Sequence, residues 1–414
     1  MRNSILGTHA EQIYSAAIRA CLPDEAVAKA LKSLPLVRGR LLLVAIGKAA
    51  WKMANAATNL LGDRINGGIV ITKYAHSEMN LPGIEFFEAG HPVPDENTLR
   101  ATTRVLRLTE HLTADDLVLF LVSGGGSALF ESVDCSLAEL SELTAQLLSS
   151  GASIEEINTV RKHLSNVKGG RFAAHCAPAH VFTVMLSDVL GDRIDVIASG
   201  PSVADASTVA DTAAIVRKYG LHLSAQMSRL LERETPKLVE NASYFVSGSV
   251  RELCRYAAEE AERLGYHTTV LTDCLSCEAA EAGRFLSAIA QTHRDSARTI
   301  AFVAGGETVV HLKGNGKGGR NQELVLAAAE GIAGLQNCCI FSVGSDGTDG
   351  PTDAAGGYAD GDTISLLREK GIEVSQMLAN NDAYRALAAS DGLIVTGPTG
   401  TNVNDLAVLL IHSK

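Results

Sequence analysis

Short, fully apolar runs alternate with segments of helical period along the first half of the chain. The runs have the length of strands and end in glycine or polar residues; they cover 41–46, 68–72, 117–122 and 181–186. Strands that are apolar on both faces are typical of a parallel sheet covered by helices on both sides. Amphipathic stretches at 49–61 and 137–148 provide such helices. The pattern therefore predicts a doubly wound α/β domain, in which ligands bind beyond the carboxyl ends of the strands.

A second block of alternating strands and helices follows a charged stretch that begins near residue 230. Strands are expected at 244–246, 268–271, 299–303, 339–343 and 406–412, with helices at 252–264, 279–293, 322–331, 363–370 and 382–389. A hairpin is expected around 305–313. Because a chain of 414 residues is longer than one hydrophobic core usually accommodates, we expect two α/β domains, 1–235 and 236–414.

Charge and composition narrow the range of partners. The net charge is −11, and no Lys/Arg block of the length that binds nucleic acid is present. Anionic substrates must therefore be held by local cationic loops, because the overall field repels them. No apolar run reaches the roughly 18 residues of a membrane span, and the first residues lack the apolar core of a signal peptide. We expect a cytoplasmic protein without nucleic-acid or membrane partners, and a homodimer stays open.

Two strand ends of the first domain carry residue types that bind anions. Lys48 follows the run 41–46 closely and precedes a helix, so its ammonium and the helix N-terminus attract the same phosphate or carboxylate. A solvent-exposed lysine is the competing interpretation. Three glycines between serines follow the run 117–122, and such a turn aims successive N–H groups at one anion. This loop consists of Ser123, Gly124, Gly125, Gly126 and Ser127.

Two further segments of the first domain are candidates for chemistry. Asp188 follows the run 181–186 and can bind Mg²⁺ or accept a proton from a hydroxyl, although a capping or turn role competes. The segment 158–170 is unusually basic for this acidic chain. Its Arg161 and Lys162 would gather an anionic substrate, although a solvated helix face is the more frequent outcome for such a run.

Two Gly-rich loops of the second domain carry the most specific signal. The first, 314–321, holds four glycines and two cations before a helix, so backbone N–H groups and Arg320 would converge on one phosphate. The second, 344–357, holds three carboxylates after a strand, and Mg²⁺ bound with nucleotide phosphates would relieve their repulsion. The predicted phosphate ligands are Gly318, Gly319, Arg320 and Asn321, and the predicted metal ligands are Asp188, Asp346, Asp349 and Asp353.

At these residues the chain resembles the class II glycerate 2-kinases, whose C-terminal half is called the MOFRL domain. The resemblance spans nearly the whole chain in order and is carried by 46–49, 90–95, 123–128, 158–170, 186–188, 197–201, 319–323 and 344–357. It implies a Rossmann-like N-terminal domain, a distinct α/β C-terminal domain and an active site in the cleft between them. It also implies phosphorylation of D-glycerate to 2-phosphoglycerate with ATP and Mg²⁺, with Lys48 and Arg320 at the positions of the family's key cations.

Phosphoryl transfer needs positioning and charge neutralisation more than covalent chemistry. We expect Lys48 and the 123–127 loop to bind phosphate groups or the glycerate carboxylate, and Arg320 to stabilise the transferring phosphoryl. Asp188 or one of the loop carboxylates would hold Mg²⁺, and a neighbouring Asp would orient the 2-hydroxyl.

Two alternatives stay open. Some family members carry the label hydroxypyruvate reductase, from tartrate degradation, but the chain lacks a good dinucleotide-binding fingerprint for NAD(P)H. A non-catalytic sugar-acid sensor is the second alternative, and it would not need three Asp residues beside a cationic loop.

Overall fold

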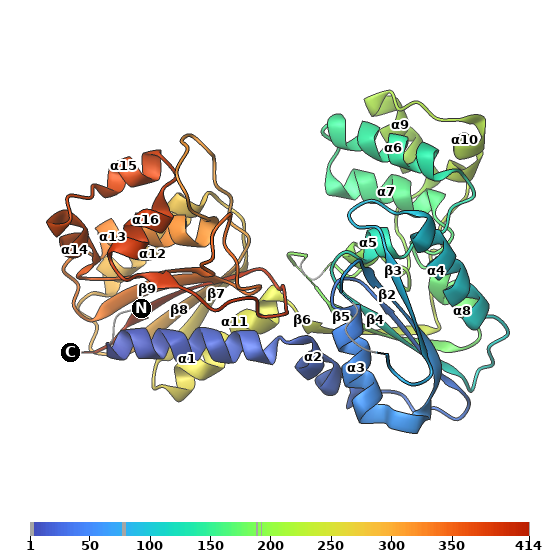
Figure 1. Cartoon of the computed structure of the whole chain (residues 1–414), viewed down its shortest axis with the longest axis horizontal. Helices are drawn as coiled ribbons and strands as arrows, with labels where there is room; N and C mark the ends of the chain where they lie inside the picture. Colours follow the sequence, from blue (N-terminus) through green and yellow to red (C-terminus); the bar gives the residue numbers. More distant parts are fainter. Residues whose placement is uncertain (1–3, 77–79, 188, 192, 414) are drawn as a thin grey trace. The chain divides into compact units, whose positions relative to one another are not determined.

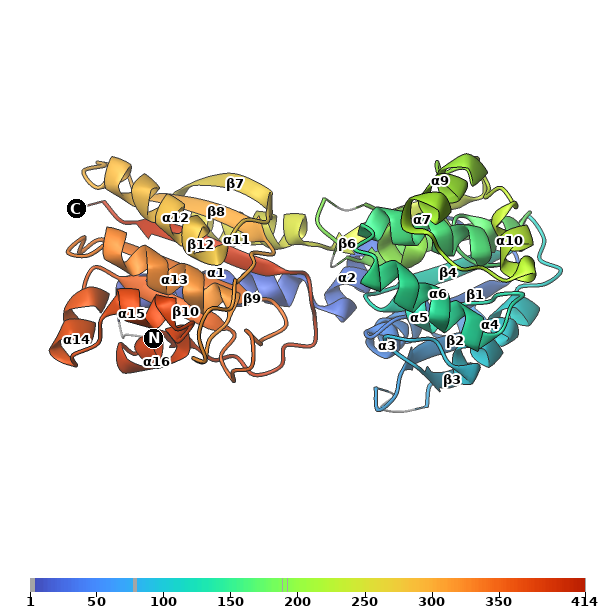
Figure 2. The same cartoon turned by 90° about the horizontal axis from the view of Figure 1, so that it is seen from above.

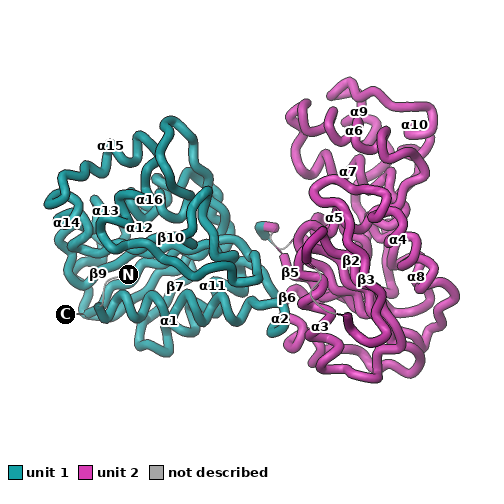
Figure 3. The backbone as a smooth tube through the Cα atoms, viewed as in Figure 1, with its two compact units in different colours: residues 1–25, 190–192, 248–414 teal, residues 26–189, 193–247 magenta. Residues whose placement is uncertain are grey.

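The computed structural model describes residues 4–76, 80–187, 189–191 and 193–413. The chain forms two compact units (Figure 3). Unit 1 contains Met1–Glu25, Leu190–Asp192 and Gly248–Lys414, and unit 2 contains Ala26–Val189 and Arg193–Ser247. The units therefore divide the chain differently from a single cut at residue 235, because the first helix of the chain packs with the C-terminal part.

Unit 2 is built on a six-stranded sheet in the order β3-β2-β1-β4-β5-β6 (Figure 1). The strands are β1 Leu41–Ile46, β2 Ile65–Lys73, β3 Ile84–Ala89, β4 Leu117–Val122, β5 His180–Leu186 and β6 Ala242–Gly248. All ladders among β1 to β5 are parallel. This is the strand order of the doubly wound dinucleotide-binding folds, in which the order reverses between the first and fourth strands. The predicted parallel sheet is confirmed, and β1 and β4 have the predicted bounds.

Side chains of β1 and β4 alternate between two buried cores. Leu42 and Phe120 face a core with α4 and α8, whereas Leu41 and Leu119 face a core with α2 and α3. Burial on both faces explains why these strands are apolar at every position. The helices around this sheet are α2 Pro23–Leu31, α3 Ala50–Leu61, α4 Glu96–Leu108, α5 Gly126–Leu129 and α8 Arg171–Cys176, with short 3₁₀ turns η1 Gly62–Arg64 and η2 Ile197–Ser199.

Four further helices of unit 2 pack on one another and form a small apolar core of their own (Figure 1). They are α6 Leu137–Ser149, α7 Ile154–Leu164, α9 Val209–Tyr219 and α10 Ala225–Leu231. Ser136 and Ser153 cap α6 and α7 with reciprocal capping boxes, which place the starts of both helices.

Unit 1 is built on a six-stranded mixed sheet in the order β11-β10-β9-β12-β8-β7 (Figure 2). The strands are β7 His267–Leu275, β8 Ile300–Gly306, β9 Cys338–Gly344, β10 Gly356–Asp360, β11 Leu393–Ile394 and β12 Asp405–Ile411. Only β7 and β8 pair in parallel among these neighbours; the other ladders are antiparallel. The predicted second α/β domain is confirmed.

Helices cover both faces of the unit 1 sheet. One face packs on α1 Ile5–Ala20 and α11 Val250–Arg263. The other packs on α12 Ala279–His293, α13 Arg320–Gly331, α14 Thr363–Glu369, α15 Val374–Ala379 and α16 Ala383–Ala389. None of the helices within the described ranges combines the length and the apolar character needed to cross a membrane.

The hairpin predicted around 305–313 is wrong. After β8 the chain continues beside the segment that follows β7, so Glu307 N–H donates to Leu275 C=O at 2.7 Å and Val309 N–H donates to Cys277 C=O at 3.1 Å. A Cβ on Gly306 would lie 2.1 Å from Leu275 O. The glycines that indicate a turn therefore permit close parallel pairing instead.

Candidate active site

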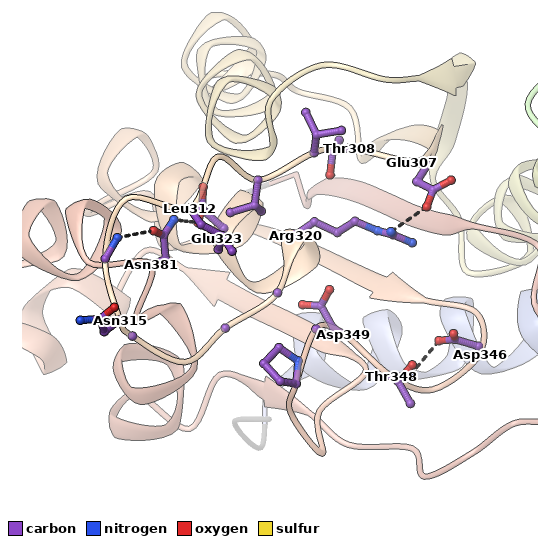
Figure 4. A pocket seen from close by; sticks show the side chains of 18 of the residues that line it. Glu307, Thr308, Leu312, Asn315, Arg320, Glu323, Asp346, Thr348, Asp349 and Asn381 are labelled. Carbon is purple, nitrogen blue, oxygen red and sulfur yellow. Dashed lines mark hydrogen bonds and ion pairs between the residues drawn. The ribbon is translucent and has the colours of Figure 1, made fainter. Parts of the chain in front are cut away.

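The two Gly-rich loops of unit 1 line one cavity of about 880 Å³ (Figure 4). Arg320 comes from the start of α13, Asp346 and Asp349 from the loop after β9, and Glu307 from the end of β8. The cavity thus lies where β8 and β9 end. The two loops therefore line the same cavity, and the predicted binding of phosphate and metal there stays a prediction.

Arg320 lines this cavity, with Glu307 at the tip of its side chain (Figure 4). Two carboxylates hold its guanidinium. Its Nε donates to Asp405 Oδ2 at 2.5 Å, its Nη2 donates to Asp405 Oδ1 at 3.1 Å, and its Nη1 donates to Glu307 Oε1 at 2.8 Å. Burial alone would lower the pKa of Arg320, but the carboxylates, Asp405 first, raise it on balance. The result is a fixed cation, because a two-pronged contact sets both the position and the plane of a guanidinium.

The glycines at 314–319 are required by a close approach of two loops. A Cβ on Gly314 would lie 2.4 Å from Asn380 Oδ1, and a Cβ on Gly316 would lie 2.4 Å from Asn380 O. The same turn takes up most of the loop's N–H groups: Gly314 N–H donates to Asn381 Oδ1 at 3.0 Å, and Lys317 N–H donates to Asp382 Oδ1 at 3.0 Å. This part of the loop is therefore held by 380–382 rather than left open to cradle a phosphate.

The last two glycines of the loop differ from the first two. Gly318 and Gly319 line the cavity, and their N–H groups have no hydrogen-bond partner within the described ranges. With Arg320 they are the donors that remain for an anion. Their predicted role in phosphate binding stays a prediction, now restricted to this end of the loop.

Asp349 caps the N-terminus of α13 from a loop far along the chain. Its Oδ1 accepts from Asn321 N–H at 3.1 Å and its Oδ2 accepts from Gln322 N–H at 2.9 Å, and both side-chain amides add further bonds. Burial raises the pKa of Asp349 to about 6, and the charge of Asp405 adds to this. Asn321 is itself buried, and its side chain is bonded to Asp349 and Ser342. The structure thus uses Asp349 and Asn321 to join the two loops.

The predicted magnesium ligands do not converge. Among the residues that the structure describes, no three His, Cys, Asp or Glu side chains form a metal-binding group. Asp353 accepts from the Tyr384 hydroxyl at 2.7 Å, and Asp346 lines the cavity with one oxygen accepting from Thr348 N–H at 2.9 Å. Asp188 lies outside the described residues. The described acids therefore do not form a site that would hold Mg²⁺ by protein ligands alone, and a metal role for these acids stays a prediction.

In unit 2, the strand-end loops after β1 and β4 are tied together. A Cβ on Gly47, whose φ is +112°, would lie 2.3 Å from Ser123 Oγ. Ser123 Oγ accepts from Ala49 N–H at 3.1 Å, and Gly124 C=O accepts from Lys48 N–H at 2.9 Å. The Lys48 side chain is exposed and makes no ion pair with a described residue. The pairing of β1 with β4 thus brings Lys48 and the triple-glycine loop together as predicted, with Ser123 in a structural role.

The cationic side chains of the basic segment 158–170 differ in whether an acidic partner holds them. Lys162 is buried and pairs with Asp205 at 3.2 Å and Asp195 at 3.7 Å. Lys168 is fully buried and pairs with Glu131 at 2.9 Å. Arg161 differs from both, because it faces a cavity of about 440 Å³ that Gly125 and Ser127 also line. Of the two predicted anion ligands in this segment, the structure leaves Arg161 available and engages Lys162.

Sequence reasoning missed Asp405 and Glu307. Asp405 opens an antiparallel strand, where it lies in register with Gly306 of β8 and Gly344 of β9. Its place beside the two strand ends follows from β12 inserting between them, which no local pattern reveals. Glu307 could have been predicted as a site residue, because it directly follows β8 and polar residues that follow a strand were singled out elsewhere in the chain.

Known protein families and curated relatives match nearly the whole length of the chain. A model of the MOFRL family matches residues 300–405, and a model described as a domain of unknown function, DUF4147, matches residues 9–232. The D-glycerate 2-kinase of Thermotoga maritima is 52% identical over 406 residues, which are 97% of each chain. An Agrobacterium vitis protein named putative hydroxypyruvate reductase is 40% identical and covers 97% of this chain and 93% of its own.

The fold agrees with a solved relative over nearly its full length. The crystal structure of glycerate kinase from Thermotoga maritima matches with a TM-score of 0.94 and 51% identity, over 98% of this chain and 99% of that one. Together with the family models in both halves and the near full-length relatives, this similarity shows that the chain belongs to the class II glycerate 2-kinase family, which carries the MOFRL domain.

Proposed function

We propose that the protein is a kinase that transfers the γ-phosphoryl group of ATP to the 2-hydroxyl of D-glycerate. The observation that carries this proposal is the fixed guanidinium of Arg320 beside the N–H groups of Gly318 and Gly319, which have no partner among the described residues. In a chain with a net charge of −11, such a group of donors is suited to the phosphates of a nucleotide. The identity of the acceptor, glycerate, is inferred from relatives named glycerate kinase.

In this reaction the bond from the γ-phosphorus to its bridging oxygen breaks and ADP leaves with that oxygen. A bond from the phosphorus to the 2-hydroxyl oxygen forms, and the hydroxyl proton is released to water. Negative charge spreads over the oxygens of the transferring group. We assign Arg320 to stabilise this charge. Because Asp405 already holds the guanidinium, Arg320 needs little reorganisation when the charge develops. Lys48 is assigned to a phosphate or carboxylate of the same reaction.

The described residues do not by themselves form a metal site, so the roles given above to Arg320 and Lys48 do not depend on a metal ion. Mg²⁺ is commonly bound by one or two carboxylates together with substrate phosphates. Asp346 is the predicted metal ligand that lines the cavity, and its second oxygen has no bond to a described residue. We expect turnover to require a divalent cation, which chelation with EDTA followed by titration with MgCl₂ tests directly.

An ADP-release assay with D-glycerate, L-glycerate and tartrate tests the proposal. We expect turnover with D-glycerate, and NMR of the product should find the phosphate on C2. A phosphate on C3 would contradict the proposed position, and absence of ADP release with all three acids would overturn the kinase proposal.

A second candidate follows from the relative named putative hydroxypyruvate reductase. It predicts oxidation of NADH or NADPH in the presence of hydroxypyruvate. The same purified protein should be assayed for both activities, with nucleotide absorbance followed at matched enzyme concentration. Hydride transfer without ADP release from glycerate would favour this candidate over the kinase.

A further inference from the structure

A second cavity, of about 440 Å³, lies within unit 2 between the turn at 125–128 and helices α6 and α7. Its volume is within the range of small-molecule sites, about 300–1,000 Å³. One part of its wall is apolar and the other is polar. The apolar part includes Val93, Leu140 and Leu148, and the polar part includes Ser127, Glu131 and Arg161.

Of the charged side chains around this cavity, Arg161 is the one whose guanidinium has no partner among the described residues. Glu131 is 3% exposed, and its carboxylate pairs with Lys168 at 2.9 Å and accepts from Ser165 Oγ at 2.5 Å and Ser132 N–H at 3.0 Å. Lys168 therefore neutralises Glu131. The guanidinium of Arg161 makes no hydrogen bond or ion pair with any residue that the structure describes.

An unpaired arginine in this position is a binding feature. Burial lowers the pKa of Arg161, with Glu131 acting in the opposite direction, so the surroundings disfavour its charge. Arginine nevertheless stays protonated in proteins, and buried charges are normally paired. A carboxylate or phosphate entering the cavity would supply the missing partner, with a planar fork that suits a carboxylate.

A chain of hydroxyls determines what Ser127 can offer a ligand. Ser199 Oγ donates its single hydrogen to Asn158 Oδ1 at 3.0 Å. The 3.1 Å contact between Ser127 and Ser199 is therefore donated by Ser127, and the remaining Ser127 lone pairs accept from a ligand hydroxyl. Ser199 and its neighbour Ala198 have φ of 59° and 50°, a costly region for non-glycine residues that the surrounding structure must hold in place.

We propose that this cavity is the acceptor-substrate subsite and that it takes small 2-hydroxy carboxylates. Arg161 binds the carboxylate, and Ser127 accepts a hydrogen bond from the 2-hydroxyl. The inference rests on the proposed function for the acid itself. All 2-hydroxy acids share the carboxylate and the 2-hydroxyl. The remaining part of the substrate, which differs between these acids, would contact the apolar part of the wall.

Calorimetric titration with D-glycerate and with its neutral amide, glyceramide, tests the role of Arg161. In Arg161→Met we expect D-glycerate to bind on the order of 100-fold more weakly, whereas glyceramide binds as to the wild type. Arg107→Met, at an exposed arginine of α4, is the matched control and should bind both as the wild type does. Equal affinity of Arg161→Met and wild type for D-glycerate would overturn the assignment, as would an equal loss for both ligands.

Ser127→Ala provides an independent test that does not depend on a change of charge. We expect it to bind D-glycerate about 5- to 10-fold more weakly and 3-hydroxypropionate, which lacks the 2-hydroxyl, unchanged. An equal effect on both ligands, or no effect, would overturn the role of Ser127.

The outcomes separate this inference from the proposed function. Wild type that binds D-glycerate with these dependences but releases no ADP would keep the subsite and overturn the kinase. Wild type that phosphorylates D-glycerate, with an Arg161→Met variant of unchanged KM, would keep the kinase and overturn the subsite.

Discussion

Asp405, the first residue of β12, holds the guanidinium of Arg320 by two hydrogen bonds, from Nε to Oδ2 at 2.5 Å and from Nη2 to Oδ1 at 3.1 Å. The two residues lie 85 positions apart in the sequence. Burial raises the pKa of Asp405, while Arg320 lowers it, so each charge depends on the other. The pair places one fixed cation in the unit 1 cavity.

Replacing Arg320 should abolish most of the turnover. We expect Arg320→Ala to lower kcat for D-glycerate by about 10²- to 10⁵-fold, the range for groups that neutralise a transferring phosphoryl. Arg263→Ala, at an exposed arginine of α11, is the control and should keep wild-type kcat. Circular dichroism of each variant checks that the fold is retained. Wild-type turnover by Arg320→Ala would exclude this role.

Asp405 should act through Arg320 rather than on the substrate. Asp405→Asn keeps the shape of the side chain but removes its charge, so the guanidinium is held less firmly. We expect kcat to fall about 10- to 100-fold with the KM for D-glycerate unchanged. Asp295→Asn, at an exposed site of unit 1, should leave both constants as they are. A raised KM with unchanged kcat would instead indicate a direct contact with the substrate.

The cap that Asp349 provides should contribute strongly to stability. Asp349→Ala leaves the N–H groups of Asn321 and Gln322 unpaired in a buried place, which costs about 2–4 kcal/mol. Asp353→Ala, in the same loop, removes one exposed bond to Tyr384 and should cost less than about 0.5 kcal/mol. Urea unfolding followed by fluorescence measures both. Equal stability of the two variants would contradict the capping role.

The fully apolar strands of both units could be predicted from the sequence, whereas the shorter or more polar strands β3, β10 and β11 and the use of the loops could not. Buried strands such as β1 read as continuous apolar runs, so their bounds follow from composition alone. Gly314 has the same appearance in a phosphate loop and in a loop that must approach Asn380 closely. Helix α1 has an apolar face, but the pattern does not say which sheet that face covers. Contacts between distant segments, such as Asp349 with α13, decided these roles.

The pKa of Asp349, raised to about 6 by burial, predicts a pH dependence of stability. In the unfolded chain this carboxyl titrates near pH 4, so between about pH 4 and 6 the folded state binds a proton that the unfolded state does not. Its contribution to the free energy of unfolding is therefore fully present below about pH 4 and lost as the pH rises through about 6. Relative to Asp349→Asn, the wild type should gain stability when the pH is lowered from 7 to 5. Urea unfolding at each pH measures this difference, and a constant difference would contradict the raised pKa.

The expectation from the sequence that Lys48 and Arg320 serve one active site stays a prediction, and kinetics of single and double variants test it. If both cations act on the same transition state, removing the second after the first costs less than removing it from the wild type, because residues that act as a unit are not additive. We expect Lys48→Met to lower kcat/KM about 10²-fold and the Lys48→Met, Arg320→Ala double variant to lose less than the product of the two single losses. Lys52→Met, at an exposed lysine of α3, paired with Arg320→Ala is the control and should show additive losses. Additive losses for Lys48 and Arg320 as well would mean that the two cations act in separate steps or at separate sites.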